Sequence, residues 1–161
     1  MNKHLVVLAT AVGLSASAVV AAPAATAAPS DWDLVFTQDA PVFGEAIVID
    51  GRVVERAWEA VLRDSKGKKV GVLLGTQRNF DAGPGGRVEM RYRTLVFEFA
   101  DGQIVAEGVT AYRSSGGLLK PGKRSIIAIT GGTGAYVGAS GELKTVHTGR
   151  GLHRQMLRFV D

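Results

Sequence analysis

The stretch IIAITGGTGAYVGASGELKTV, residues 126–146, decides the fold of this chain. Its two ends are apolar and β-branched, with the alternation typical of strands. The twelve residues between Gly131 and Glu142 include five glycines, which suit a sharp corner between neighbouring strands. The sequence therefore predicts a strand, a glycine-rich corner and a second strand.

The start of the same stretch, Thr130 to Gly134, also resembles the phosphate-binding turn of dinucleotide-binding proteins. That turn needs a third glycine three residues further on, at the start of a helix. Val137 occupies that position, Gly138 comes one residue late, and no helical pattern follows. Only 27 residues (161 minus 134) remain after Gly134, too few for a dinucleotide-binding unit. The nucleotide interpretation is therefore excluded.

Residues 1–27 have the pattern of a secretory signal peptide. Lys3 and His4 precede an apolar stretch that begins at Leu5, and Ala25-Thr26-Ala27 forms an A-x-A cleavage site. We predict cleavage after Ala27, a secreted protein without a stable membrane anchor, and one domain over residues 28–161.

Composition excludes several classes of function. The chain has no cysteine, which removes disulfides, thiolate nucleophiles and cysteine-ligated metals. The net charge of +4 is mild, and no compact basic face interleaves with aromatic residues, so we do not predict nucleic-acid binding. An exported domain without disulfides must draw its stability from core packing and from contacts between subunits.

Strand and turn patterns fill the rest of the chain. Val42–Asp50 is apolar but interrupted by Gly44 and Glu45, and we interpret it as an extended connection. A helix is conceivable over Val54–Arg63, although the following turn at Asp64–Gly67 favours a hairpin. The predicted strands are Asp33–Gln38, Val53–Leu62, Val70–Gln77, Val88–Phe99, Ile104–Tyr112, Ser125–Thr130, Ala139–His147 and Leu152–Val160.

Eight strands joined by short connections predict an all-β fold, an eight-stranded antiparallel up-and-down β-barrel. Closure into a barrel removes exposed edges, and eight strands leave an interior that holds side chains or one small ligand. Gly131, Gly132, Gly134 and Gly138 are expected to be structural residues at a barrel corner.

Three segments resemble the allene oxide cyclase and dirigent barrels, and their exported bacterial relatives in particular. The segments are GQIVAEG at 102–108, residues 127–142, and MLRFV at 156–160. The resemblance implies an eight-stranded barrel, usually trimeric, with a largely apolar cavity and no cofactor. Plant members close an epoxide-derived ring or steer the coupling of phenoxy radicals, and the barrel fixes the conformation of the substrate. On the first strand, Gln38 stands in for the amide of the cyclases' Glu-x-Asn pair, whereas Phe36 replaces the carboxylate.

Alternation within the strands nominates residues for a ligand cavity. Tyr92 shares a face with Met90, Thr94 and Val96, and this face is expected to point inward. Arg91 and Arg93 would then lie on the solvated or intersubunit face. A tyrosine in the packed core, with no ligand, is the alternative for Tyr92. The candidate cavity residues are Gln38, Arg56, Trp58, Tyr92, Thr94 and Gln155.

His147 and His153 flank a predicted turn and could meet across a hairpin, but the sequence offers no third ligand, so no metal site is predicted. The expected function is binding of one small, mainly apolar molecule by a cofactor-free isomerase, cyclase or stereo-directing protein. The alternative is a non-catalytic, lipocalin-like binding or scaffold barrel. A homotrimer is expected, with Leu73, Val105 and Val109 among its outward apolar residues.

Overall fold

The computed structural model describes residues 32–81, 88–113 and 119–160, and these residues form one antiparallel β-sheet. The predicted signal peptide, residues 1–27, lies outside the described residues. No helix in the described ranges is long and apolar enough to cross a membrane. The elements are β1 (Leu34–Gln38), β2 (Val42–Ile49), β3 (Arg52–Arg63), β4 (Lys69–Asp81), β5 (Val88–Phe99), β6 (Gly102–Arg113), β7 (Arg124–Gly132), a short 3₁₀ turn η1 (Gly134–Tyr136), β8 (Gly141–Gly149) and β9 (Leu152–Phe159).

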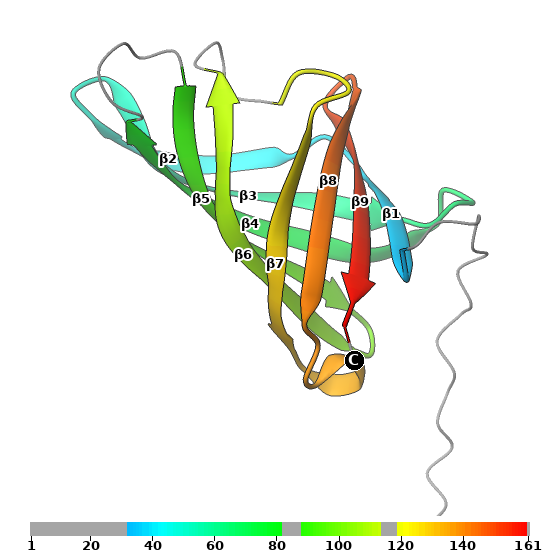
Figure 1. Ribbon diagram of the computed structural model, residues 1–161. Coiled ribbons are helices and arrows are strands. Elements are labelled where there is room, and N and C mark those ends of the chain that lie inside the picture. The colour runs from blue at the N-terminus through cyan, green and yellow to red at the C-terminus, as the bar shows by residue number, and fades with distance from the viewer. Residues whose placement is uncertain (1–31, 82–87, 114–118, 161) are drawn as a thin grey trace, which may run out of the picture.

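The sheet closes into a barrel because β1 pairs with both the first and the last strand of the series β3–β9. Strands β3 to β9 form a continuous meander in which each pairs with the next (Figure 1). β1 then joins β9 to β3, with Gln38 opposite His153 on one side and opposite Leu62 on the other. The eight strands β1 and β3–β9 therefore form the closed antiparallel barrel that the sequence predicts.

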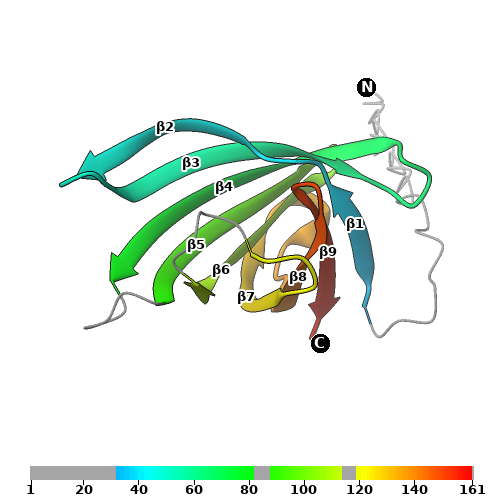
Figure 2. The same cartoon turned by 90° about the horizontal axis from the view of Figure 1, so that it is seen from above.

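β2 corrects the sequence-based expectation of an extended connection over residues 42–50. It is a strand that pairs with the first half of β3 and lies outside the closed barrel, where β2, β3 and β4 extend away from β1 (Figure 2). Gly44 and Glu45 obscured the alternation because the β2–β3 pairing shifts register between Phe43 and Ala46, at an irregularity that includes them.

One half of the barrel interior is apolar. It lies toward the end at which β5 finishes and β6 begins, the lower end in Figure 1. Leu73, expected to face outward, is fully buried in this cluster, because it pairs with Phe97 across β4 and β5. The core residues are Phe36, Leu62, Leu73, Leu95, Phe97, Ile104, Ala106, Ile127, Ile129, Leu143 and Leu157.

The glycine corner closes this apolar end. Gly134 has a φ of 60°, and a Cβ there would stand 2.2 Å from the carbonyl oxygen of Asp101. The amide of Ala135 donates a hydrogen bond of 2.9 Å to the same oxygen, which ties the corner to the β5–β6 turn. The 3₁₀ turn that begins at Gly134 is three residues long and is followed by β8, so the corner lacks the α-helix that a phosphate-binding turn requires.

Candidate functional site

The other half of the barrel interior is lined by buried polar side chains. They lie toward the end at which β5 begins and β6 finishes, the upper end in Figure 1. Such groups are costly to bury unless they have hydrogen-bonding partners, so their concentration in one place calls for a functional explanation. The buried polar residues are Gln38, Arg91, Arg93, Thr110, Ser125, Thr145, His147, His153 and Gln155.

Two arginines on β5 carry the positive charge of this site. Arg91 and Arg93 are only 4% and 6% exposed, and they alternate with Leu95 and Phe97 on the inward face. The guanidinium of Arg91 donates to Glu89 at 2.7 Å and lies 4.1 Å from the centre of the Tyr112 ring. The charge of Arg91 is thus neutralised inside the protein.

Arg93 is placed differently. Its Nη2 donates to Ser125 Oγ at 2.8 Å and to Thr110 Oγ1 at 3.1 Å, and both partners are neutral hydroxyls. Within the described ranges Arg93 has no carboxylate partner, and its buried Nε has no hydrogen-bond acceptor. Burial, and to a lesser degree the neighbouring charge of Arg91, lowers the pKa of Arg93.

Strand register places Arg93 in a row with two further polar residues. Arg56 on β3 pairs with Gln77 on β4, which in turn pairs with Arg93 on β5. The next row toward the apolar half is Trp58, Gly75 and Leu95. A basic row therefore borders an aromatic and apolar row.

His147 and His153 form a stacked pair on β8 and β9. They are cross-strand partners whose ring centroids lie 4.9 Å apart with an angle of 25° between the planes. The Nδ1 of His147 contacts the carbonyl oxygen of Leu119, and because a carbonyl only accepts, this nitrogen carries the proton. The other ring nitrogen of His147, Nε2, is buried and has no hydrogen-bond partner among the described residues.

The environment keeps His153 neutral. Burial, then the neighbouring His147 and then Arg93, lower the pKa of His153 to about 4, against a weaker opposing effect of a backbone hydrogen bond at Gly151. Strand register links the two groups, because Ser125, the partner of Arg93, lies opposite Thr145, two residues before His147 on β8.

A hydrogen-bonded chain of neutral side chains lies beside the histidines. Thr145 Oγ1 donates to Gln155 Oε1 at 2.7 Å, and Gln155 Nε2 donates to Gln38 Oε1 at 2.5 Å. All three side chains are buried. The chain links β8, β9 and β1 and holds the β1 strand in place at the polar end.

The structure brings four of the six candidate residues to the interior face. Gln38 and Gln155 are buried there, while Arg56 and Trp58 are half-buried and share a strand face with buried Ala60 and Leu62. The inward placement of Tyr92 and Thr94 was wrong. Tyr92 is 38% exposed and its hydroxyl donates to Glu107 at 2.8 Å on the outside, and Thr94 lies on the same outer face.

The most strongly charged part of the interior was not predicted from the sequence. Arg91 and Arg93 were expected on an outer face, because the opposite set on β5, with Met90, Tyr92 and Val96, is itself apolar. The sequence did contain a pattern that indicates the inward face. Leu95 and Phe97 follow Arg91 and Arg93 at intervals of two residues, so all four side chains lie on the same face of the strand. His147 and His153 were recognised as potential neighbours but not as part of this site.

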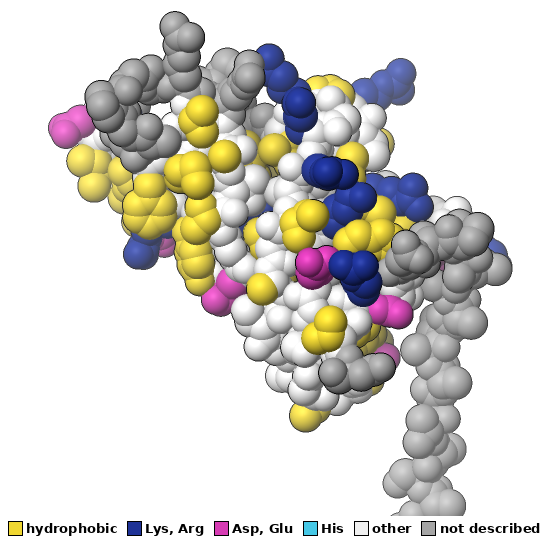
Figure 3. Space-filling model, in the orientation of Figure 1, with side chains coloured by type: hydrophobic (Ala, Val, Ile, Leu, Met, Phe, Trp, Pro, Cys, Tyr) yellow, Lys and Arg dark blue, Asp and Glu magenta, His cyan; other side chains and the backbone are white. Residues whose placement is uncertain are grey.

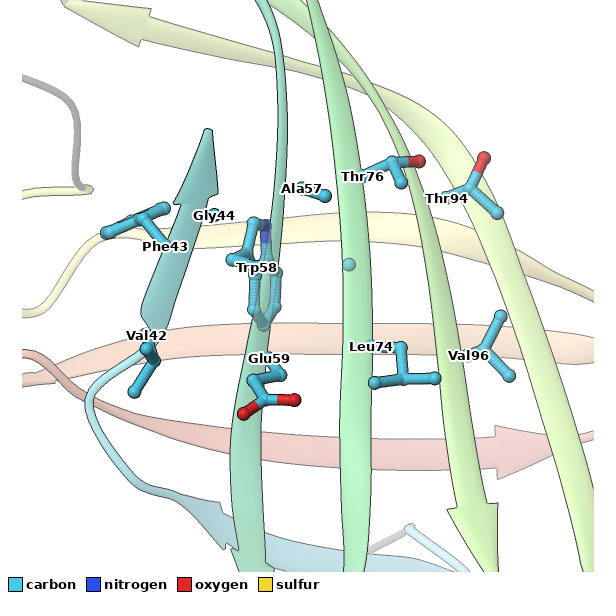
Figure 4. A pocket seen from close by; sticks show the side chains of 11 residues that line it. Val42, Phe43, Gly44, Ala57, Trp58, Glu59, Leu74, Thr76, Thr94 and Val96 are labelled. Atoms are coloured by element: carbon cyan, nitrogen blue, oxygen red, sulfur yellow. The ribbon is translucent and has the colours of Figure 1, made fainter. Parts of the chain in front are cut away.

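An apolar groove of about 450 Å³ lies on β2–β5, where Trp58 and Gly75 line it together with outer-facing residues (Figure 4). Val42, Leu74 and Val96 follow one another across it, with Glu59 between the first two. In Figure 3 hydrophobic side chains gather over the end of the molecule where β2 and β5 lie, whereas Lys and Arg side chains gather over β7–β9. Thr94 lines this outer groove and not the interior.

In the part of the chain that the structure describes, no three His, Cys, Asp or Glu side chains gather as a metal site would require.

No protein-family model and no curated protein matches this chain. Among solved structures, the chain is similar to a protein described as pyocyanin demethylase, with a TM-score of 0.59 and 22% sequence identity. The match covers 78% of this chain and 97% of that one. At this identity, the likeness shows that the two proteins share the barrel fold.

Proposed function

We propose that this barrel binds one small, mainly apolar molecule in its interior and acts on it as a cofactor-free isomerase or cyclase. The observation that carries the proposal is the buried Nε2 of His147, which has no hydrogen-bond partner in the described ranges, on the same inward face as Thr145, which lies opposite Ser125, the partner of Arg93. An unpaired base near an unpaired donor is the arrangement that proton transfer with oxyanion stabilisation requires. The half-buried indole of Trp58 supplies an apolar surface one row from Arg93.

The chemistry needs no external oxidant or reductant. His147 Nε2 removes a proton from a carbon next to a carbonyl group, and the C–H electron pair moves to form an enolate. The positive charge of Arg93 stabilises the enolate oxygen, and the imidazolium returns its proton to a different atom of the same molecule. The net result is an isomerisation. A ring closure follows where the bound conformation brings the enolate carbon to a second carbonyl carbon of the same molecule, whose oxygen receives the electron pair and then the proton of the imidazolium.

A non-catalytic, lipocalin-like binding barrel is the second candidate. It is favoured by the Thr145–Gln155–Gln38 chain, in which the hydroxyl of Thr145 and the amides of the two glutamines hydrogen-bond to one another within the protein. Groups that are already paired serve to hold the barrel together, and fewer polar groups are then left for catalysis.

Native mass spectrometry and extraction of the copurifying small molecule test the proposal. The extracted molecule is incubated with wild type, with His147→Gln and with the control Lys144→Gln, which alters an outward residue of the same strand. We expect wild type and the control to change the isomer composition, and His147→Gln to bind without changing it. Binding without conversion by wild type would establish the non-catalytic alternative. The absence of any bound molecule would contradict both.

We also propose that the protein is exported and functions as a homo-oligomer, most simply a trimer. The pattern of residues 1–27 supports export. Edman sequencing of the protein recovered from culture medium should begin near Ala28. A start at Met1 would contradict export.

The outer face of β2–β5 supports the oligomer. Several of its large hydrophobic side chains are exposed, which is unusual for a monomer and is typical of an interface between subunits. Sedimentation at micromolar concentration should show an oligomer that Val42→Lys dissociates. Ile126→Lys, on the outer face of β7, is the matched control and should leave it intact. A monomeric wild type would refute the proposal. The exposed large hydrophobic residues on β2 and β4 are Val42, Phe43, Ile47, Val48, Ile49, Leu74 and Phe80.

A further inference from the structure

We infer that the small molecule is an organic carboxylate, with the carboxylate bound by the interior row Arg56–Gln77–Arg93 and the apolar body over Trp58. This inference rests on the proposed function, because it names the class of molecule that the same interior would take. It follows from strand register, from unpaired donors and from the charges on the inward faces of β3, β4 and β5.

The first step is the balance of charge. In the described ranges neither Arg56 nor Arg93 forms an ion pair, whereas Arg63, Arg78, Arg91 and Arg158 each pair with a carboxylate. Arg78 is instructive, because it lies next to Gln77 on β4 but points outward to Glu55. The charge of the outward Arg78 on β4 is thus neutralised by Glu55. On the inward face, the residue between Arg56 and Arg93 is the neutral Gln77.

The second step is the supply of donors. The Nε atoms of Arg56 and Arg93 are buried and have no hydrogen-bond partner within the described ranges. In the described ranges Arg93 donates only to neutral hydroxyls and the guanidinium of Arg56 lies 5.1 Å from the centre of the Phe43 ring, so no anion compensates for the desolvation of the buried charge of Arg93. A carboxylate is the acceptor that matches a guanidinium in charge and geometry. The unpaired Nε–H groups of Arg56 and Arg93 are therefore the donors that bind the anion.

The third step is the position of the apolar body. Trp58 lies one row from Arg56 and pairs with Gly75, which has no side chain to occupy the space on the inward face of β4. The ring of Trp58 lies over that backbone and packs against the apolar core cluster. A ligand with its carboxylate at the arginine row would extend its apolar part across the indole toward the core.

The pair 2-naphthoate and 2-naphthylmethanol tests the inference, because the two probes share an aromatic body and differ in charge. Isothermal titration calorimetry of the full mature chain measures both affinities. A charge-assisted pair with Arg93 should give 2-naphthoate a preference of at least about tenfold. Arg93→Gln should lower this preference to about threefold or less and leave the affinity for 2-naphthylmethanol unchanged. Arg78→Gln is the matched control and should retain the full preference.

The outcomes separate this inference from the proposed function. Equal affinities for the two probes, or an unchanged preference in Arg93→Gln, would overturn the carboxylate while leaving an apolar binding barrel. Failure of the wild-type protein to bind either probe would overturn both. If Arg93→Gln does not fold, NMR spectra of the arginine Nε–H groups of wild type, recorded with each probe, test the inference instead. 2-Naphthoate should shift two of them, and 2-naphthylmethanol should not; no shift with 2-naphthoate would refute the inference.

Discussion

The indole of Trp58 lies directly over the backbone of its cross-strand partner Gly75. A Cβ at residue 75 would stand 2.2 Å from Cε2 of the indole, well inside van der Waals contact. The large residue on β3 therefore depends on the missing side chain on β4. This pairing sets the boundary between the apolar half of the interior and the basic row of Arg56, Gln77 and Arg93.

Gly75→Ala should destabilise the barrel by about 1–3 kcal/mol, because the added methyl group overpacks the space that the indole fills. Urea unfolding measures the loss. The double variant with Trp58→Leu should recover part of it, since the smaller side chain makes room for the methyl group. If the two substitutions are simply additive, Trp58 and Gly75 are not coupled as the structure shows.

Tyr92→Phe should leave both stability and ligand binding unchanged. The substitution removes one outward hydrogen bond to Glu107, which also raises the pKa of Tyr92, and it touches no interior group. Thermal unfolding and calorimetry with 2-naphthoate measure the two effects. A loss of affinity would show that the outer face of β5 takes part in binding.

Acid should destabilise the protein through His153. Its pKa is about 4 in the folded chain and about 6.5 in the unfolded chain, so the unfolded state binds more protons between these values. Stability is therefore lost as the pH falls from about 6.5 to 4. This single group contributes at most ~3 kcal/mol.

The difference between wild type and His153→Gln isolates that contribution from other titrating groups. Urea unfolding at pH 7 and at pH 4.5 should show a smaller decrease in the variant than in wild type. Equal decreases would mean that His153 titrates normally in the folded protein.

Gly134→Ala should cost about 1 kcal/mol or more, because residue 134 has a positive φ and a Cβ would meet the Asp101 carbonyl. Gly131→Ala is the matched control in the same corner, since a Cβ there meets nothing within 4 Å. Thermal unfolding compares the two. Similar melting temperatures for both variants would contradict a structural role for Gly134.

Alternation in the sequence was sufficient to predict the barrel and insufficient to orient all of its strands. Each of the eight predicted strands is present, because strand spacing and turns repeat along the whole chain. On β3 and β9 the inward faces were also right, since Trp58 and Gln155 share them with residues of plainly apolar character.

On β5 the same reasoning reversed the two faces. The outer set contains Tyr92 and Val96, and the inner set contains Arg91 and Arg93. Over the first half of the strand the outward face is therefore more hydrophobic than the inward face. Buried arginines and an apolar exterior each violate the simple pattern. Such violations are expected at a binding site and at a surface that contacts another subunit, and pattern alone cannot anticipate them.

The β1–β3 seam has a consequence for the order of folding. Strands β3 to β9 join neighbours in sequence and can assemble as successive hairpins, whereas β1 must pair with β9, more than a hundred residues away. Only two residue pairs connect β1 to β3. Contacts of such high sequence separation form late, because chain entropy opposes them until the rest is in place. The first strand of the barrel is thus the last to dock, and the buried Gln38 reaches Gln155 only as the curved sheet becomes a closed ring.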